Sequence, residues 1–215
     1  MDSATATDCA DWRGTGIVSG VTTNSTILAR CGATSVTATV RQILACGPDE
    51  VHAQVLSEVD EQAFLQAIAL AAIDPRIRVK IPFVTSQGRS RAALIRRVRE
   101  AGVQVNITVC TSRAELYAAL SLGPEYLSIL WCRTRDAGED PAAVVQAVAT
   151  RRSSTGSTTK LVIGSIREPD DVTAALDSPC DIVTVPPAVL DKWLVSPRSV
   201  EMARQFANDA AGLDA

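Results

Sequence analysis

The segment Arg78-Val79-Lys80-Ile81-Pro82 is the most informative one in the chain. Its apolar residues alternate as in a short buried strand, with a lysine in the middle. Lysine is rarely buried without a functional reason, and burial lowers the pKa of its ammonium group. The neutral amine can attack a carbonyl carbon and form a Schiff base. Two interpretations follow from these residues alone: a nucleophilic lysine, or a lysine whose head reaches water at a strand end.

The other lysines and the single histidine narrow the chemistry further. Lys160 precedes an apolar run and Lys192 falls in a predicted helix, so neither shares the setting of Lys80. His52 is the only histidine, which excludes a His-rich metal site. It opens an apolar strand instead of closing one, so we expect a structural role for it and no Ser-His-Asp relay.

Length and composition bound the class of protein. With 215 residues, 47% hydrophobic and 21% charged, the chain is expected to form a single domain over residues 1–215, although two small domains would also fit this length. A net charge of −3 without an extended basic block argues against nucleic acid as a partner. No apolar run is long enough to cross a membrane, and the polar residues 1–11 do not resemble a signal peptide. The six cysteines show no CxxC spacing, so we expect reduced thiols in a cytoplasmic protein.

Strand and helix patterns alternate along the whole chain. Strands are predicted at residues 17–24, 51–57, 79–84, 103–110, 126–132, 161–166 and 181–185. Helices are predicted at residues 7–13, 25–31, 36–45, 60–73, 89–101, 112–122, 141–150, 169–176, 187–193 and 198–211, with a loop at 151–159. The strands are short and apolar, as expected where both faces of a parallel sheet are covered. An eighth strand would complete a (β/α)8 TIM barrel, and an open doubly wound sheet is the alternative.

Polar residues near the strand ends favour the barrel. They occur at alternating positions that can share one face: Thr22, Asn24, Gln54, Lys80, Asn106, Thr108, Ser128, Ser165 and Arg167. Burying so many polar groups is costly unless they meet one another or a ligand. In a barrel they converge at the mouth where the βα loops form active sites, whereas in an open sheet they would not all meet. We therefore predict a TIM barrel with an extra C-terminal helix.

The segments that carry these residues resemble a known family. They are Gly20-Val21-Thr22-Thr23-Asn24, Ala53-Gln54-Val55, Val79-Lys80-Ile81-Pro82, Val105-Asn106-Ile107-Thr108, Ser128 to Arg133, and Gly164-Ser165-Ile166-Arg167. In order and spacing they are similar to successive strands of the small transaldolases and of the fructose-6-phosphate aldolases, which belong to one superfamily. The resemblance covers nearly the whole chain. It implies a class I aldolase barrel that uses a Schiff-base lysine, with no metal and no cofactor.

The resemblance implies catalytic roles for four residues. Lys80 attacks the ketose carbonyl, Asp2 takes the proton of the substrate C4 hydroxyl, and Gln54 and Thr108 orient a water molecule. Asp2 directly follows Met1, so the first strand is predicted to be short or truncated. Either the start assigned to the chain is too late, or the barrel closes with a stub. A frayed terminal aspartate without a role is the alternative.

The resemblance also implies the substrates, which are sugar phosphates. Asn24, Asn106 and Ser128 would hydrogen-bond a dihydroxyacetone unit, and Arg133, Ser165 and Arg167 would bind the terminal phosphate. The alternative for the two arginines is that they are ordinary surface residues. Family members often form pentamers or decamers through the C-terminal helix, so a homo-oligomer that uses residues 198–211 is expected.

Several residues depart from the family pattern. Leu130 stands where transaldolases have Phe and the aldolases have Tyr, and Ser25 replaces the usual Pro. Gln54 stands where larger transaldolases have Glu. The altered pocket wall suggests a transaldolase with an unusual acceptor in a specialised pathway, such as formation of the eight-carbon sugar of lincosamide antibiotics. The alternatives are an aldolase of the fructose-6-phosphate type and a non-catalytic sugar-phosphate binder.

Overall fold

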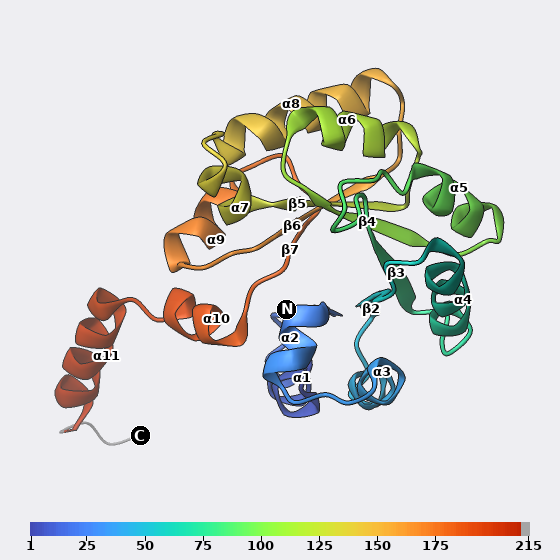
Figure 1. Cartoon of the computed structure of the whole chain (residues 1–215). Coiled ribbons are helices and arrows are strands. Elements are labelled where there is room, and N and C mark those ends of the chain that lie inside the picture. The colour runs from blue at the N-terminus through green and yellow to red at the C-terminus, as the bar shows by residue number, and fades with distance from the viewer. Residues whose placement is uncertain (212–215) are drawn as a thin grey trace.

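The computed structural model describes residues 1–211 and shows one curled sheet of parallel strands surrounded by helices (Figure 1). The sheet has seven strands in the order β1-β2-β3-β4-β5-β6-β7, so each strand pairs with its neighbours in the sequence. The strands are β1 (Gly20–Thr22), β2 (Glu50–Gln54), β3 (Ile77–Pro82), β4 (Val105–Cys110), β5 (Tyr126–Leu130), β6 (Lys160–Gly164) and β7 (Ile182–Val183). This is the α/β, TIM-barrel-like arrangement that the sequence predicts.

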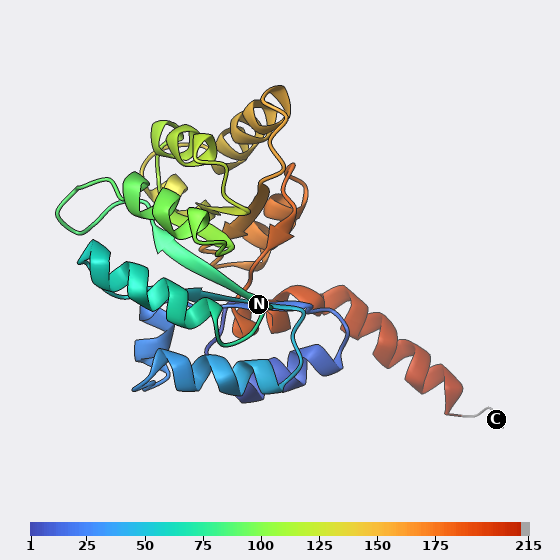
Figure 2. The same ribbon diagram turned by 90° about the vertical axis from the view of Figure 1, so that its right-hand side faces the viewer.

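The helices α1 to α10 lie around the outside of the sheet, and α11 projects away from it in both views (Figures 1 and 2). They are α1 (Ala6–Gly14), α2 (Ser25–Arg30), α3 (Val36–Ala45), α4 (Asp60–Ala71), α5 (Ala92–Glu100), α6 (Arg113–Ser121), α7 (Trp131–Asp136), α8 (Pro141–Ser154), α9 (Pro169–Leu176), α10 (Pro187–Leu194) and α11 (Pro197–Ala210). Within the described residues, no helix combines the length and apolar character needed to span a bilayer.

The first three residues connect the two edges of the sheet. The Asp2 amide donates to the carbonyl of Val185, just beyond β7. On the other side, the Thr22 amide donates to Met1 O and the Ser3 amide donates to Thr22 O. Residues 1–3 therefore bridge β1 and the segment after β7, although they form an isolated bridge to Thr22 instead of a full strand. This agrees with the prediction of a short first strand.

Strand register places the polar residues of neighbouring strands side by side. Gln54 on β2 lies opposite Lys80 on β3, and Lys80 lies opposite Asn106 on β4. Residues two apart on a strand share a face, so His52 joins the same inner face. The residues between them, such as Val79 and Ile81, are fully buried on the outer face against the helices. The interior of the curled sheet is thus partly polar and its outside is apolar.

Two sequence predictions were wrong. The strand predicted at 126–132 ends at Leu130, and Trp131 begins helix α7, where Trp131 and Cys132 are buried in the core. Apolar residues run without interruption across this junction, so periodicity alone cannot separate the strand from the helix. The loop predicted at 151–159 begins later, because α8 continues to Ser154. At this end of the helix, the hydroxyls of Ser154 and Thr155 both donate hydrogen bonds to the Arg151 carbonyl.

Candidate active site

A cavity of about 500 Å³ opens at the carboxyl ends of the strands. Nine of the ten residues predicted to act in catalysis or binding line it: Asp2, Asn24, Gln54, Lys80, Thr108, Ser128, Arg133, Ser165 and Arg167. The tenth, Asn106, is fully buried directly behind Ser128 and hydrogen-bonded to it. The structure therefore brings residues from all parts of the chain to one place, as the pattern of polar strand ends predicts.

Lys80 is the buried amine of the cavity. Its exposed fraction is 8%, and its Nζ donates a hydrogen bond to the Thr23 carbonyl at 3.1 Å. Burial lowers the pKa of this amine, attraction to the Asp2 carboxylate opposes that change, and repulsion from Arg133 adds to it. The net direction is downward, which increases the fraction of neutral amine at a given pH. A side chain in this state is suited to nucleophilic attack on a carbonyl.

Asp2 is held in place by a pair of threonines. The Thr22 hydroxyl donates to Asp2 Oδ1 at 2.8 Å, and the Thr184 hydroxyl lies 2.6 Å from the Thr22 hydroxyl oxygen. Thr22 and Thr184 are both buried. Together with the backbone hydrogen bonds of residues 1–3, these contacts fix the carboxylate at the seam between β1 and β7. Asp2 is therefore an ordered part of the cavity wall and not a frayed terminus.

Gln54 and Thr108 present free polar groups to the cavity. Within residues 1–211, neither side chain makes a hydrogen bond to another protein group, although both line the cavity. Thr108 precedes Val109, which has a φ of 61° at a break in the pairing of β4 with β5. A β-branched residue rarely adopts this left-handed conformation, and such strain persists where the surrounding structure holds it, often at functional sites.

Asn106 and Ser128 form a hydrogen-bonded pair beneath the cavity, with Ser128 Oγ donating to Asn106 Oδ1 at 2.8 Å. Asn24 lines the cavity and also caps a helix. Its Oδ1 accepts a hydrogen bond from the Ile27 amide at 3.0 Å and so caps the first turn of α2. Its side-chain nitrogen stays available to a ligand in the cavity.

Three arginines stand around the cavity mouth. The Arg133 side chain makes no hydrogen bond or ion pair within the described residues, whereas the Arg167 side chain is held by Asp136 through hydrogen bonds of 3.1 and 2.5 Å. Ser165, at the end of β6, has a φ of 60° and lines the same region. Arg30, at the end of α2, also lines the cavity and was not predicted. These positive groups make the mouth suitable for an anionic ligand.

Thr184 and Arg30 line the cavity but were not among the residues predicted from the sequence. Only Thr184 has a sequence pattern that could have identified it. Thr184 interrupts the apolar run Val183-Thr184-Val185 at a strand end, which is the same pattern that identified the other polar residues. Arg30 lies on an exposed helix among ordinary surface residues, and no feature of its local sequence separates it from the other arginines. In the described part of the chain, no three His, Cys, Asp or Glu side chains gather closely enough to hold a metal ion.

Sequence comparison identifies the family. The family profile described as "Transaldolase/Fructose-6-phosphate aldolase" matches residues 1–214. The chain belongs to the transaldolase/fructose-6-phosphate aldolase family. A protein of a Caulobacter species named "Probable transaldolase" is 30% identical over 212 residues, which cover 99% of this chain and 95% of that protein. Another "Probable transaldolase", from Dehalococcoides mccartyi, is 31% identical over 195 residues, with 90% and 88% covered.

Solved structures of other enzymes share the fold. A mandelate oxidase mutant with a monooxide FMN adduct superposes with a TM-score of 0.62 at 12% identity, covering 85% of this chain and 59% of that one. A flavocytochrome b2 variant with bound sulfite gives a TM-score of 0.60 at 12% identity, covering 95% and 58%. The chain thus spans less than two thirds of these proteins. At this identity the likeness concerns the fold alone.

Proposed function

We propose that this member of the family is a class I transaldolase, which transfers a dihydroxyacetone unit from a ketose phosphate to an aldose phosphate. The observation that supports this most strongly is the setting of Lys80. Its amine is buried at the base of the cavity and donates a hydrogen bond to a main-chain carbonyl, and burial lowers its pKa. The Asp2 carboxylate acts on it electrostatically and lines the same cavity. A nucleophilic amine beside a proton acceptor is what Schiff-base cleavage of a ketose requires.

The reaction follows from these two groups. The Lys80 amine attacks the carbonyl carbon C2, and loss of water gives an iminium ion. Asp2 removes the proton of the C4 hydroxyl, the C3–C4 bond breaks, and its electron pair moves into the iminium to form an enamine. The aldehyde product leaves and an acceptor aldehyde takes its place. The enamine attacks the new carbonyl, the alkoxide takes back the proton from Asp2, and water hydrolyses the iminium to free Lys80.

Gln54 and Thr108 are suited to handle the water in this cycle. Their side chains face the cavity and are not occupied by other protein groups within residues 1–211. Neither side chain ionises at neutral pH, so both would act by orienting a water molecule that carries protons between substrate and solvent. The pair Asn106 and Ser128, together with the Asn24 amide nitrogen, would bind the hydroxyls of the dihydroxyacetone unit.

The phosphate of the substrate would lie among Arg133, Ser165 and Arg167. Arg133 is free to form two parallel hydrogen bonds with a phosphate, as a planar guanidinium does. Arg167 is already paired with Asp136, so a phosphate must either share Arg167 or displace that carboxylate. Arg30 extends the same positive surface. Substrates with a second anionic group would bind more tightly because of Arg30.

The seven strands and residues 1–3 together would make a closed eight-stranded barrel, with the stub as its shortened first strand. Hydrogen bonds from this stub to both Thr22 and Val185 support closure. A single domain over residues 1–215 also stays a prediction, and residues 212–215 lie outside the described part. A cytoplasmic location and a place in a specialised sugar pathway also stay predictions.

Assembly into a pentamer or decamer would use helix α11. This helix buries none of its side chains against the rest of the chain, and Met202 and Phe206 are exposed on it, Phe206 to 61%. A helix with an apolar stripe and no partner in its own chain is suited to pack on a second copy. The contact would be measured by the mass of the assembly in solution before and after removal of residues 197–215.

The second candidate is simple aldol cleavage, as in the fructose-6-phosphate aldolases. Gln54 favours it, because a glutamine stands where larger transaldolases have a glutamate. A non-catalytic sugar-phosphate binder is a third candidate, and the ordered Asp2 argues against it. Product analysis separates them. With fructose 6-phosphate as donor, a transaldolase forms a new ketose phosphate only when an aldose phosphate is added, an aldolase releases free dihydroxyacetone without it, and a binder forms no product.

A further inference from the structure

A chain of hydrogen-bonded polar side chains, buried except for its first member Glu50, runs from the amino ends of the strands to the active-site cavity. Glu50 Oε1 lies 3.2 Å from His52 Nε2, and His52 Nδ1 lies 2.8 Å from Asn106 Nδ2. Asn106 Oδ1 in turn accepts the hydrogen bond from Ser128. His52 is only 1% exposed and Asn106 is fully buried. The histidine therefore connects a carboxylate at one end of the sheet to a residue that lines the cavity at the other.

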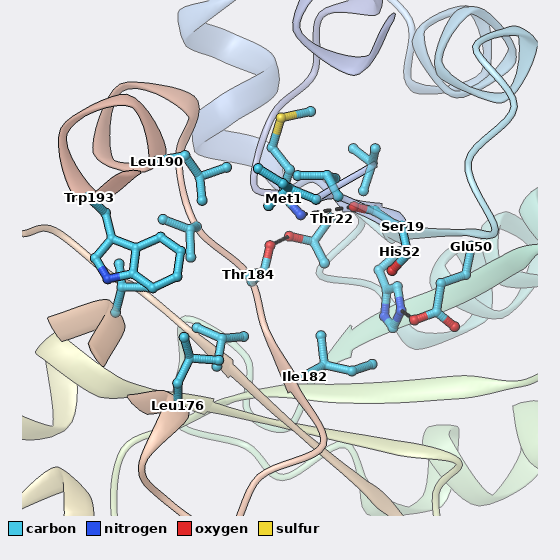
Figure 3. Close-up of a pocket in the computed structure, with 17 residues that line it drawn as sticks. Met1, Ser19, Thr22, Glu50, His52, Leu176, Ile182, Thr184, Leu190 and Trp193 are labelled. Carbon is cyan, nitrogen blue, oxygen red and sulfur yellow. Dashed lines mark hydrogen bonds and ion pairs between the residues drawn. The ribbon is translucent and has the colours of Figure 1, made fainter. Parts of the chain in front are cut away.

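Glu50 and His52 sit on the wall of a second cavity, of about 220 Å³, near the amino ends of β1, β2 and β7 (Figure 3). Figure 3 shows the two side chains pointing toward one another, away from the Thr22–Thr184 pair that lines both cavities. Glu50 is also anchored by the Tyr126 hydroxyl, which donates to it at 2.7 Å, and by Arg78 at 3.6 Å. Tyr126 packs edge-on against the imidazole, with ring centroids 4.8 Å apart.

These contacts select one tautomer of His52. Burial raises the pKa of Glu50, but the hydrogen bonds from His52 and Tyr126 outweigh it and lower the pKa to about 2. An ionised carboxylate accepts only, so His52 Nε2 must carry the proton. The charged and titratable groups facing His52 are Glu50, Arg78, Lys80 and Tyr126. Burial lowers the pKa of His52, and Glu50 opposes this incompletely, so the ring is neutral and its Nδ1 is an acceptor.

An acceptor at Nδ1 fixes the orientation of the neighbouring amide. The Asn106 Nδ2 group donates to it, which turns the Asn106 oxygen toward Ser128. The Ser128 hydroxyl must then donate to that oxygen, and its lone pairs are left to face the cavity. Ser128 is therefore prepared to accept a hydrogen bond from a substrate hydroxyl. With the amide reversed, Ser128 would receive a hydrogen bond from Asn106 and present its own hydrogen to the cavity instead.

We propose that His52 is a positioning residue: its Nδ1 holds the Asn106 amide so that Ser128 acts as an acceptor for a hydroxyl of the ketose. This inference rests on the proposed function, because it concerns the same cavity. It predicts that the site prefers donors whose dihydroxyacetone unit carries both terminal hydroxyls over a 1-deoxy donor that lacks one. His52 would contribute to this preference without touching the substrate.

The test compares variants of the full chain on a ketose phosphate and on its 1-deoxy analogue. His52→Leu removes the acceptor and should raise KM for the ketose phosphate about tenfold with a smaller change in kcat, because a ground-state contact is lost. The preference for the ketose phosphate over the 1-deoxy analogue should fall by a similar factor. His52→Asn restores an acceptor near the Nδ1 position and should recover most of both losses. Tyr126→Phe is the matched control, since it removes a partly buried hydrogen bond to Glu50 and leaves the His52–Asn106 contact in place.

The outcomes separate positioning from stability. An unchanged preference in a folded His52→Leu protein would overturn the inference, and so would equal losses in Tyr126→Phe. Should His52→Leu fail to fold, Glu50→Gln keeps the shape and removes the charge that selects the tautomer. It should raise KM about threefold, and an unchanged KM and preference would again overturn the inference. The proposed function fails separately, if the unmodified protein forms no borohydride-reduced adduct at Lys80.

Discussion

Lys80 Nζ donates a hydrogen bond to the main-chain oxygen of Thr23 at 3.1 Å. A carbonyl oxygen only accepts, so it can bind both the ammonium and the neutral amine and does not force either state. The position of the amine is thus fixed while its protonation is left to burial and to the nearby charges of Asp2 and Arg133. An amine that is held still and has a lowered pKa would need little rearrangement to act as the proposed nucleophile.

The first prediction concerns the site of covalent attachment. Incubation with fructose 6-phosphate and borohydride should add one reduced adduct at Lys80, detected by peptide mass spectrometry. Lys80→Met keeps an unbranched side chain and should remove both the adduct and turnover. Lys192→Met, on the exposed face of α10, is the control and should keep both. An adduct on Lys160 or Lys192 in the unmodified protein would contradict the assignment.

The second prediction concerns stability and pH. The folded chain lowers the pKa of Lys80 below its ordinary value of 10.5. At any pH between the folded-state pKa and 10.5, the unfolded chain therefore binds more protons than the folded chain. Burial of the amine therefore opposes folding at low pH, and the penalty declines as pH rises toward 10.5. Lys80→Met should be more stable than the native chain near neutral pH, by a margin that narrows in alkaline solution. Urea unfolding at several pH values measures this, and a margin independent of pH would show that Lys80 is not the cause.

The third prediction concerns metals. Treatment with a chelator should leave turnover unchanged, because in the proposed mechanism the iminium on Lys80 would supply the electrophile that a zinc ion supplies in other aldol reactions. The measurement is the initial rate before and after dialysis against EDTA, with zinc added back as the control. Activity that is lost on dialysis and restored by zinc would require another mechanism.

Much of the fold could be predicted because its cause is local. The helices at Val36–Ala45 and Pro169–Leu176 have the bounds that their sequence patterns predict. Polar residues at strand ends, such as Gln54 and Lys80, could be assigned to one site because parallel strands end at the same edge. Helix α7 could not be predicted, because the apolar run through Leu130 and Trp131 fits a strand and a buried helix equally well.

The rest of the site depends on contacts between distant parts of the chain. In the sequence His52 has the position of an ordinary strand residue, and its significance lies in its contact with Asn106, 54 positions away. Arg30 faces the cavity only because α2 packs beside the mouth. The pairing of Arg167, after β6, with Asp136, at the end of α7, likewise joins residues separated by 31 positions. Register and helix packing determine these contacts, and neither can be read from residue types.

The last prediction concerns the phosphate and its competitor. Arg167→Ala should lower kcat/KM for phosphorylated substrates by about one to two orders of magnitude, since a hydrogen bond to a charged group contributes roughly 1.5–3 kcal/mol and about 1.4 kcal/mol is tenfold. Ketoses without phosphate should lose much less, because they do not engage this arginine. Asp136→Asn removes the charge that pairs with Arg167. If the phosphate displaces Asp136, this variant should bind phosphorylated substrates more tightly than the native enzyme.

Arg133→Ala provides the comparison within the same site. Arg133 has no ion-pair partner in the described residues, so its loss should cost at least as much as the loss of Arg167. The double variant should lose less than the sum of the two single effects, because both arginines would hold one anion. The measurement is the steady-state kinetics of the native chain, the two single variants and the double variant, each with a ketose phosphate and with the free ketose. Equal losses on both substrates would show that Arg167 supports the fold of the βα loops through Asp136 and does not bind phosphate.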